Sequence, residues 1–211
     1  MIDFLLATVP VVVVLFISEY GWRKKLVRGE AARKLVHILV GSFVAFWPHF
    51  LSRGEILIMS VAFFCVVVFS QVFNIFSAIH GNGGRQFGEI LFAASIGFVA
   101  VVAPSDWAFT VATLHMSLAD GLAGLVGSHW GATSSYVVFG HKKSLVGSVT
   151  FMAASFVIIV LAVAVSPQLA VNRPLVLALI PFVSAGAENI GVLGTDNLLV
   201  PVSVLLLLQA L

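Results

Sequence analysis

The sequence predicts an all-α integral membrane protein, a polytopic bundle of seven or eight transmembrane helices forming one domain over residues 1–211. Three observations predict this fold class. Of the 211 residues, 60% are hydrophobic and only 9% are charged, whereas an ordinary soluble domain has roughly 25% charged residues. The apolar residues occur in long runs, near the roughly 20 residues that span a bilayer as a helix. The runs also lack the alternating pattern of membrane β-barrel strands.

This composition excludes several classes of protein. With 11 basic and 9 acidic residues, the chain could not cover the surface of a soluble fold of this size, which excludes a cytosolic enzyme and a nucleic-acid-binding domain. So much apolar sequence also excludes a disordered chain. The only cysteine, Cys65, has no partner for an intrachain disulfide. The expected partners are therefore the lipid bilayer and molecules that reach it, not nucleic acid.

Eight apolar segments are expected to form the helices, in the order 4–20, 35–51, 56–79, 87–103, 107–127, 145–165, 174–193 and 197–211. The first is not typical of a cleaved signal peptide, because Asp3 precedes its apolar core and basic residues follow it. The last would be roughly 22 Å long as a helix, which is short for a span. The sequence contains no repeat and no linker that would indicate a second domain.

The basic residues predict the orientation of the bundle, because cytoplasmic loops are enriched in lysine and arginine. If the loop after the first segment is cytoplasmic and eight segments alternate, both termini lie on the non-cytoplasmic side. Nine bases then lie on the cytoplasmic side and two on the other. The nine are Arg23, Lys24, Lys25, Arg28, Arg33, Lys34, Arg85, Lys142 and Lys143, against Arg53 and Arg173.

Most acids are expected on the same side, although the orientation rule does not require them there. They are Glu19, Glu30, Glu89, Asp120, Glu188 and Asp196. An acid inside a membrane is costly and indicates a functional site. Asp120 is expected about two turns inside its helix, and Glu188 lies within the seventh segment. Several acids at one depth, opposite bases, therefore predict a site at the cytoplasmic surface.

Small residues surround two of these charged positions. Gly121, Gly124 and Gly127 follow Asp120. A helix face made of small residues favours close packing against another helix. Helix packing does not explain why an acid lies inside this segment. Lys142 and Lys143 precede a predicted helix start at Ser144, with Gly147 and Ser148 following. Such a helix start binds phosphate, but a pair of orienting lysines followed by a serine cap explains the pattern equally well.

Other polar residues have both structural and functional interpretations. Arg33 and Lys34 could anchor lipid headgroups, while His37 is one turn deeper in the segment. Glu89 could pair with Arg85 four residues earlier. Asp196 or Asn197 could cap the last helix. We interpret His115, near mid-membrane, as a hydrogen-bonded structural histidine.

Together these groups predict phosphoryl or nucleotidyl chemistry on a lipid. Carboxylates and amides at one depth suit a hard divalent cation, and Mg²⁺ commonly joins carboxylates to nucleotide phosphates. The lysines suit those phosphates. Because the sequence leaves no room for a separate soluble domain, the acceptor is expected to be a membrane lipid.

Six motifs, in chain order, resemble the CTP-dependent lipid-alcohol kinases, which include polyprenol and dolichol kinases, phytol kinase and the yeast-type diacylglycerol kinase. The motifs are similar, more distantly, to phosphatidate cytidylyltransferases. They are Arg33-Lys34-Leu-Val-His37, Gly88-Glu89-Ile-Leu-Phe, Asp120-Gly121-x-Ala-x-x-x-Gly127, Lys142-Lys143-Ser144-x-x-Gly147-Ser148, Glu188 and Asp196-Asn197-x-x-Val-Pro201.

The resemblance implies transfer of the CTP γ-phosphate to the hydroxyl of a lipid alcohol, with Mg²⁺ or another divalent cation. The CTP phosphates would be held by Lys142, Lys143, Ser144, Gly147 and Ser148, with Gly121, Gly127, Arg33 and Lys34. Metal ligands would be Asp120, Glu89, Asp196 and Asn197. Catalytic residues would be Asp120, Glu188, Glu89 and His37: Glu188 or Asp120 would accept the hydroxyl proton, and His37 would steady phosphate or an acid.

Two other functions remain open from the sequence. A cytidylyltransferase would use the same groups to make a CDP-lipid from CTP and a lipid phosphate. A small ion- or proton-coupled transporter would use the acids as an ion pathway, which requires polar residues to continue to the opposite face. The outer halves of the predicted helices are nearly featureless apart from His115, so we favour the kinase.

Overall fold

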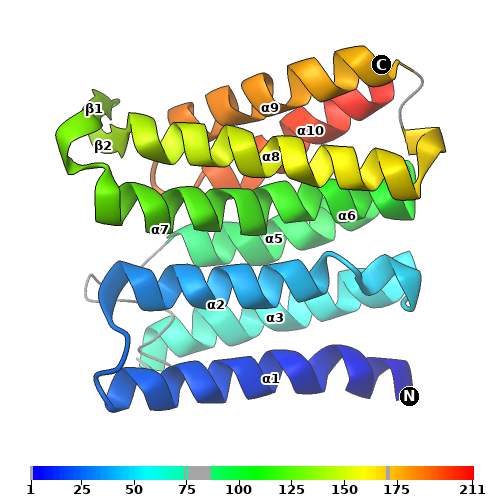
Figure 1. Cartoon of the computed structure of the whole chain (residues 1–211). Helices are drawn as coiled ribbons and strands as arrows, with labels where there is room; N and C mark the ends of the chain where they lie inside the picture. The colour runs from blue at the N-terminus through cyan, green and yellow to red at the C-terminus, as the bar shows by residue number, and fades with distance from the viewer. Residues whose placement is uncertain (1, 74, 76–86, 170–171) are drawn as a thin grey trace.

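The computed structural model describes residues 2–73, 75, 87–169 and 172–211, and within these it is almost entirely helical (Figure 1). The helices are α1 (Ile2–Arg23), α2 (Gly29–Val44), α3 (Arg53–Phe73), α5 (Phe87–Val102), α6 (Asp106–Leu114), α7 (Asp120–Trp130), α8 (Leu145–Val165), α9 (Arg173–Ile190) and α10 (Asp196–Ala210). The predicted helical membrane fold is thus confirmed.

Within the described residues, four helical stretches are long and apolar enough to cross a membrane: Ile2–Arg23, Arg53–Phe73, Asp106–Trp130 and Leu145–Val165. Two others, Phe87–Val102 and Asp196–Ala210, are apolar but shorter. Apolar side chains are exposed along most of α1 and α3, as expected of helices that face lipid. These helices identify a membrane protein, while the number of crossings remains a prediction.

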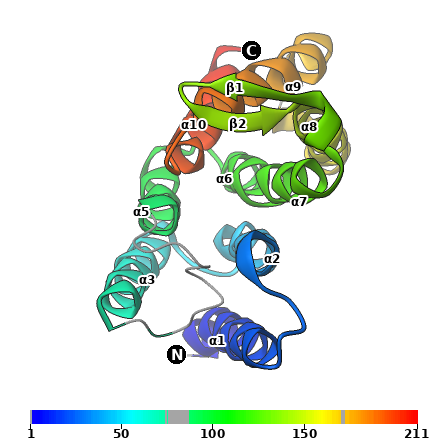
Figure 2. The ribbon, with the colours of Figure 1, turned by 90° about the vertical axis from the view of Figure 1, so that its left-hand side faces the viewer.

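α6 and α7 form one continuous helix joined by a π-helical turn, His115–Ala119. Figure 2 shows this central helix among α2, α5, α8 and α10, with α1 at the edge of the bundle. His115 is fully buried in the π turn, where Nδ1 lies 2.8 Å from the Val111 carbonyl oxygen and Nε2 lies 2.8 Å from Ser155 Oγ. The interpretation of His115 as a structural histidine is confirmed.

Two short antiparallel strands, β1 (Ser135–Val138) and β2 (His141–Ser144), form a hairpin that the sequence pattern did not predict. Val138 pairs with His141, so Phe139 and Gly140 form a two-residue turn. Both have positive φ, 47° and 80°, the geometry that suits a tight hairpin. The hairpin places Lys142 and Lys143 immediately before α8.

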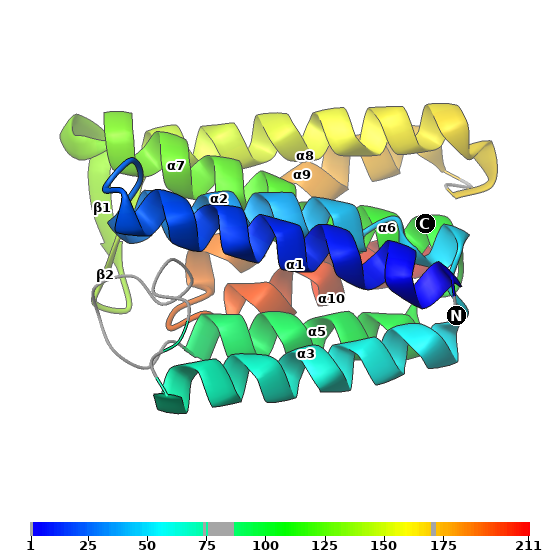
Figure 3. The ribbon, with the colours of Figure 1, turned by 90° about the horizontal axis from the view of Figure 1, so that it is seen from below.

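The two ends of the bundle differ in what they carry. Figures 1 and 3 show both termini at one end and the hairpin at the other, together with the basic α1–α2 connection. The α9–α10 connection approaches α5 at the hairpin end, where a Cβ on Gly194 would lie 2.1 Å from Gly88 Cα. Gly194 therefore leaves no room for a larger residue, while a Cβ on Gly88 would lie a tight 3.3 Å from Gly194 Cα, and this contact sets the start of α10 beside the start of α5.

Candidate active site

A polar cavity of about 510 Å³ lies at the hairpin end of the bundle. Its walls come from α2, α7, the hairpin, the first turn of α8, the end of α9, the α9–α10 connection and the start of α10. It brings together most of the predicted site residues: Arg33, Lys34, Asp120, Gly127, Lys142, Lys143, Ser144, Gly147, Ser148, Glu188 and Asp196. Residues more than 150 positions apart in the chain therefore share one cavity, as expected of a site and not of orientation signals alone.

Asp120 lines this cavity and is 4% exposed. Lys34 Nζ donates to Asp120 Oδ2 at 2.6 Å, and Lys34 is itself only 8% exposed. His37 Nε2 lies 3.6 Å from the same oxygen and donates to the Met116 carbonyl at 2.9 Å. A buried carboxylate needs such a partner, because an unpaired buried charge is strongly destabilising.

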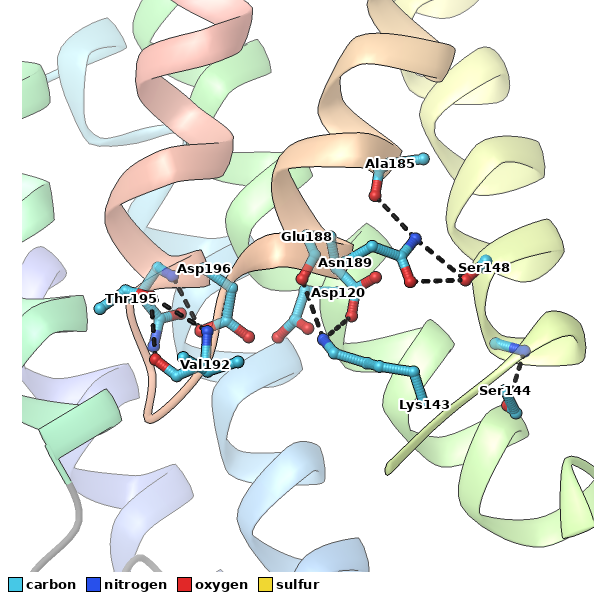
Figure 4. Close-up of polar contacts among 12 residues, drawn as sticks. Asp120, Lys143, Ser144, Ser148, Ala185, Glu188, Asn189, Val192, Thr195 and Asp196 are labelled. Atoms are coloured by element: carbon cyan, nitrogen blue, oxygen red, sulfur yellow. Dashed lines mark hydrogen bonds and ion pairs between the residues drawn. The ribbon is translucent and has the colours of Figure 1, made fainter. Parts of the chain in front are cut away.

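A second lysine–carboxylate pair lines the same cavity. Lys143 Nζ donates to Glu188 Oε1 at 2.5 Å and to the Glu188 backbone carbonyl at 2.9 Å (Figure 4). The strand position of Lys143 directs its side chain toward α9, whereas the neighbouring Lys142 has no ion-pair partner among the described residues. Two adjacent lysines in the sequence therefore have different surroundings.

Asp196 completes the acidic part of the cavity. It is the first residue of α10, and its Oδ1 accepts from the backbone N–H of Asn197 at 3.1 Å. Figure 4 shows its carboxylate facing that of Asp120, with Glu188 beside them. Three acids from α7, α9 and α10 thus meet at one depth, as the sequence predicts.

The carboxylate oxygens that line this cavity suit a divalent cation that is also bound by the phosphates of a substrate. In the part of the chain that the structure describes, no group of three or more His, Cys, Asp or Glu side chains could by itself hold a metal ion. Mg²⁺ does not need such a group, because it usually binds one or two carboxylates together with substrate phosphates and water. Asp120 and Asp196, which face each other, match that requirement.

The side chain of Ser144 caps the start of α8, as the sequence predicts. Ser144 Oγ accepts from the Gly147 backbone N–H at 3.1 Å. Gly127 and Gly147 let α7 and α8 approach closely, since a Cβ on Gly127 would lie 3.2 Å from Gly147 Cα. Capping and packing thus account for these three residues, although all of them also line the cavity.

Tyr136 belongs to this region although nothing in the sequence pattern indicates it. Its hydroxyl donates to Asn189 Oδ1, and Asn189 Nδ2 donates to Ser148 Oγ at 3.1 Å. These bonds join the hairpin to α8 and α9. The sequence offers one signal for this role, a tyrosine in an apparent loop, and aromatic residues are common in loops at a membrane surface.

Four predicted site residues do not line the polar cavity. Gly121 packs against α2, where a Cβ would lie 2.2 Å from Ile38 Cγ1. The other three, His37, Glu89 and Asn197, line a second and smaller cavity, which Arg33 also borders. Gln71 Nε2 donates to Glu89 Oε2 at 3.1 Å. Arg85 lies outside the described residues, so the expected Arg85–Glu89 pair stays a prediction.

The fold and the cavity define a helical membrane protein that gathers buried carboxylates and lysines into one polar site at one end of its bundle. No family model matches the chain, and no solved structure matches it. Among curated proteins, the chain is 32% identical over 198 residues to the phytol kinase of Synechocystis sp., an alignment that covers 89% of this chain and 82% of that protein. The chain belongs to the lipid-alcohol kinase family. A similarity to phosphatidate cytidylyltransferases is not shown by these comparisons.

Proposed function

We propose that this protein is a CTP-dependent kinase that transfers the γ-phosphate to the hydroxyl of a membrane lipid alcohol at the cytoplasmic face. One observation carries the proposal: Asp120, Asp196, Glu188 and three lysines share a single polar cavity at the basic end of the bundle. Phosphoryl transfer depends mainly on positioning and charge stabilisation, which such a cavity provides. The phytol kinase relative supports a long isoprenoid alcohol as the acceptor class.

The nucleotide phosphates would lie against the hairpin and the start of α8. Lys142 lines the cavity and has no ion-pair partner among the described residues, so its ammonium group can bind phosphate directly. Asp120 and Asp196 would hold Mg²⁺, which when bound offsets the charge of the phosphates. Lys34 and Lys143 hold Asp120 and Glu188 in place.

The acceptor hydroxyl must lose a proton when its oxygen bonds to the γ-phosphorus. We assign the acceptance of that proton to a carboxylate of the cavity, either Asp120 or Glu188. His37 approaches Asp120 from α2, one turn after Lys34. These assignments make Asp120→Asn and Glu188→Gln the informative variants for the chemical step.

The direct test offers the purified protein, in lipid, CTP labelled at the γ-phosphate together with phytol, a polyprenol or diacylglycerol. We expect a labelled lipid phosphate and CDP, with ATP as the donor for comparison. If a lipid phosphate is consumed instead and pyrophosphate is released, the protein is a cytidylyltransferase. If no acceptor becomes labelled and no pyrophosphate appears, neither transferase reaction is correct, and ion transport is the next function to test.

A further inference from the structure

A small cavity of about 40 Å³ lies beside the polar site and differs from it in character. Its walls are mostly apolar and come from five helices, α1, α2, α3, α5 and α10. The apolar residues that matter here are Leu15, Val40, Phe63, Val67 and Phe92. On the same measure one water molecule needs roughly 10–15 Å³, so this cavity has room for only a few water molecules. The cavity can therefore take the end of a molecule but not a long chain.

One end of this cavity is polar. Arg33 and His37 precede Val40 on α2, and Glu89 precedes Phe92 on α5, so the polar groups lie toward the hairpin end. Asn197 borders the same end. Its Nδ2 donates to the Gly88 carbonyl at 2.7 Å, while its Oδ1 has no hydrogen-bond partner among the described residues. A buried acceptor without a donor is costly, and a hydroxyl would satisfy it.

The polar end of the small cavity adjoins the large polar cavity of the candidate active site. Arg33 borders both cavities. His37 lines the small cavity while its Nε2 lies 3.6 Å from Asp120 Oδ2 in the large one. Phe92 packs against the His37 ring at a centroid distance of 4.6 Å. A hydroxyl placed beside His37 would thus lie one side chain away from the Asp120 carboxylate.

We propose that this cavity binds the alcohol end of the acceptor lipid, an inference that rests on the proposed kinase function. The hydroxyl lies between His37 and Asn197, the first carbons pack among Phe63, Val67 and Phe92, and the rest of the chain lies in the bilayer beside α1 and α3. In the transfer, the hydroxyl oxygen bonds to the γ-phosphorus, the bond to the β-phosphate oxygen breaks, and the proton passes to a cavity carboxylate. CDP and a lipid phosphate result.

The test compares two neighbouring valines on α3. Val67 is 2% exposed and lines the small cavity, whereas Val66 is 48% exposed and lies outside it. Val67→Phe fills the cavity and should raise KM for the lipid alcohol about tenfold, equivalent to about 1.4 kcal/mol, with KM for CTP unchanged. Val66→Phe should match the wild type. Equal acceptor KM values in all three proteins would overturn the inference.

A second variant and a second readout cover the case in which Val67→Phe fails to fold. Val67→Ala enlarges the cavity and should retain folding while shifting preference toward acceptors that are bulkier next to the hydroxyl. A phytol analogue with a diazirine near its hydroxyl should label the helices that line this end of the cavity, α2, α3, α5 or α10, in the wild type and in Val66→Phe, but not in Val67→Phe. Labelling confined to helices that do not line the small cavity would contradict the site.

The labelling does not require catalysis, so the two proposals can fail separately. Labelling at the cavity without phosphate transfer would retain the binding site and reject the kinase. Transfer with labelling elsewhere, and with no effect of Val67→Phe or Val67→Ala, would retain the kinase and reject this acceptor site.

Discussion

Lys34 and Asp120 form a buried ion pair between α2 and α7, with 2.6 Å between Nζ and Oδ2. The lysine stem reaches the acid by passing over Gly124, where a Cβ would lie 2.6 Å from Lys34 Cε. Gly124 thus provides the space that the lysine stem occupies. The glycine face after Asp120 therefore serves helix packing and also the position of a charged pair in the cavity.

Lys34→Met should destabilise the protein because it leaves the Asp120 carboxylate buried without its partner. Breaking a buried pair on one side costs about 3–5 kcal/mol. Thermal unfolding in lipid should therefore shift down clearly for Lys34→Met. The double variant Lys34→Met/Asp120→Asn removes both charges and should recover part of the loss. A single variant as stable as the wild type would show that the pair contributes nothing to folding.

Gly124→Ala should reduce turnover more than it reduces stability. The new methyl group meets the flexible end of Lys34 and not backbone, so the lysine can move aside, but it then leaves Asp120. Gly121→Ala should instead lower stability, because its methyl group meets Ile38 Cγ1 at 2.2 Å. The measurements are kcat with CTP and the midpoint of thermal unfolding.

Gly186→Ala is the matched control for these two variants. A Cβ there has no atom within 4 Å, and alanine favours a helix over glycine by roughly 1 kcal/mol. We expect unchanged turnover and equal or higher stability. If Gly124→Ala behaves like Gly186→Ala in both measurements, the role of Gly124 as space for Lys34 is wrong.

The sequence predicts the depth of the site residues along the bundle better than it predicts which way their side chains face. Apolar runs and loop charges place Asp120, Lys143, Glu188 and Asp196 at one level, and the structure brings them together. Depth follows from position along a helix, which the chain itself specifies. Which way a residue faces depends on how each helix is rotated against its neighbours, and packing decides that.

Glu89 and Asn197 illustrate this limit. Both lie at the expected depth but face the small cavity, because the contact between Gly88 and Gly194 sets how α5 and α10 meet. The π turn His115–Ala119 changes the direction of Asp120 relative to the helix before it. No pattern in the sequence marks such a turn. The hairpin is hard to predict for a related reason, since its strands are only four residues long.

Lys142 and Lys143 should give different phenotypes although they are adjacent. Lys142→Ala removes a cation without an ion-pair partner among the described residues, so KM for CTP should rise while the stability of the protein stays near that of the wild type. Lys143→Ala leaves Glu188 buried without its lysine, so both stability and kcat should fall. Steady-state kinetics and thermal unfolding of each variant separate the two effects.

Arginine substitutions, which retain the positive charge, are the controls for Lys142→Ala and Lys143→Ala. Lys142→Arg keeps a cation at the cavity and should retain much of the affinity for CTP. Lys143→Arg must fit a larger group against Glu188 and its carbonyl, and should recover less. Identical kinetic changes in Lys142→Ala and Lys143→Ala would contradict the separate roles that the structure gives them.

Removing divalent cations should abolish turnover and nucleotide binding without unfolding the protein. Lys34 and Lys143 already compensate Asp120 and Glu188, so chelation with EDTA should leave the thermal midpoint of the free protein unchanged. CTP at 100 times its Kd should stabilise the protein by about 2.7 kcal/mol, but only when Mg²⁺ is present. Asp196→Asn should weaken that stabilisation, because it removes one of the two facing carboxylates that would share the cation. If CTP stabilises the EDTA-treated protein as much as the Mg²⁺-loaded one, the acids serve the charge balance of the cavity and do not bind a metal.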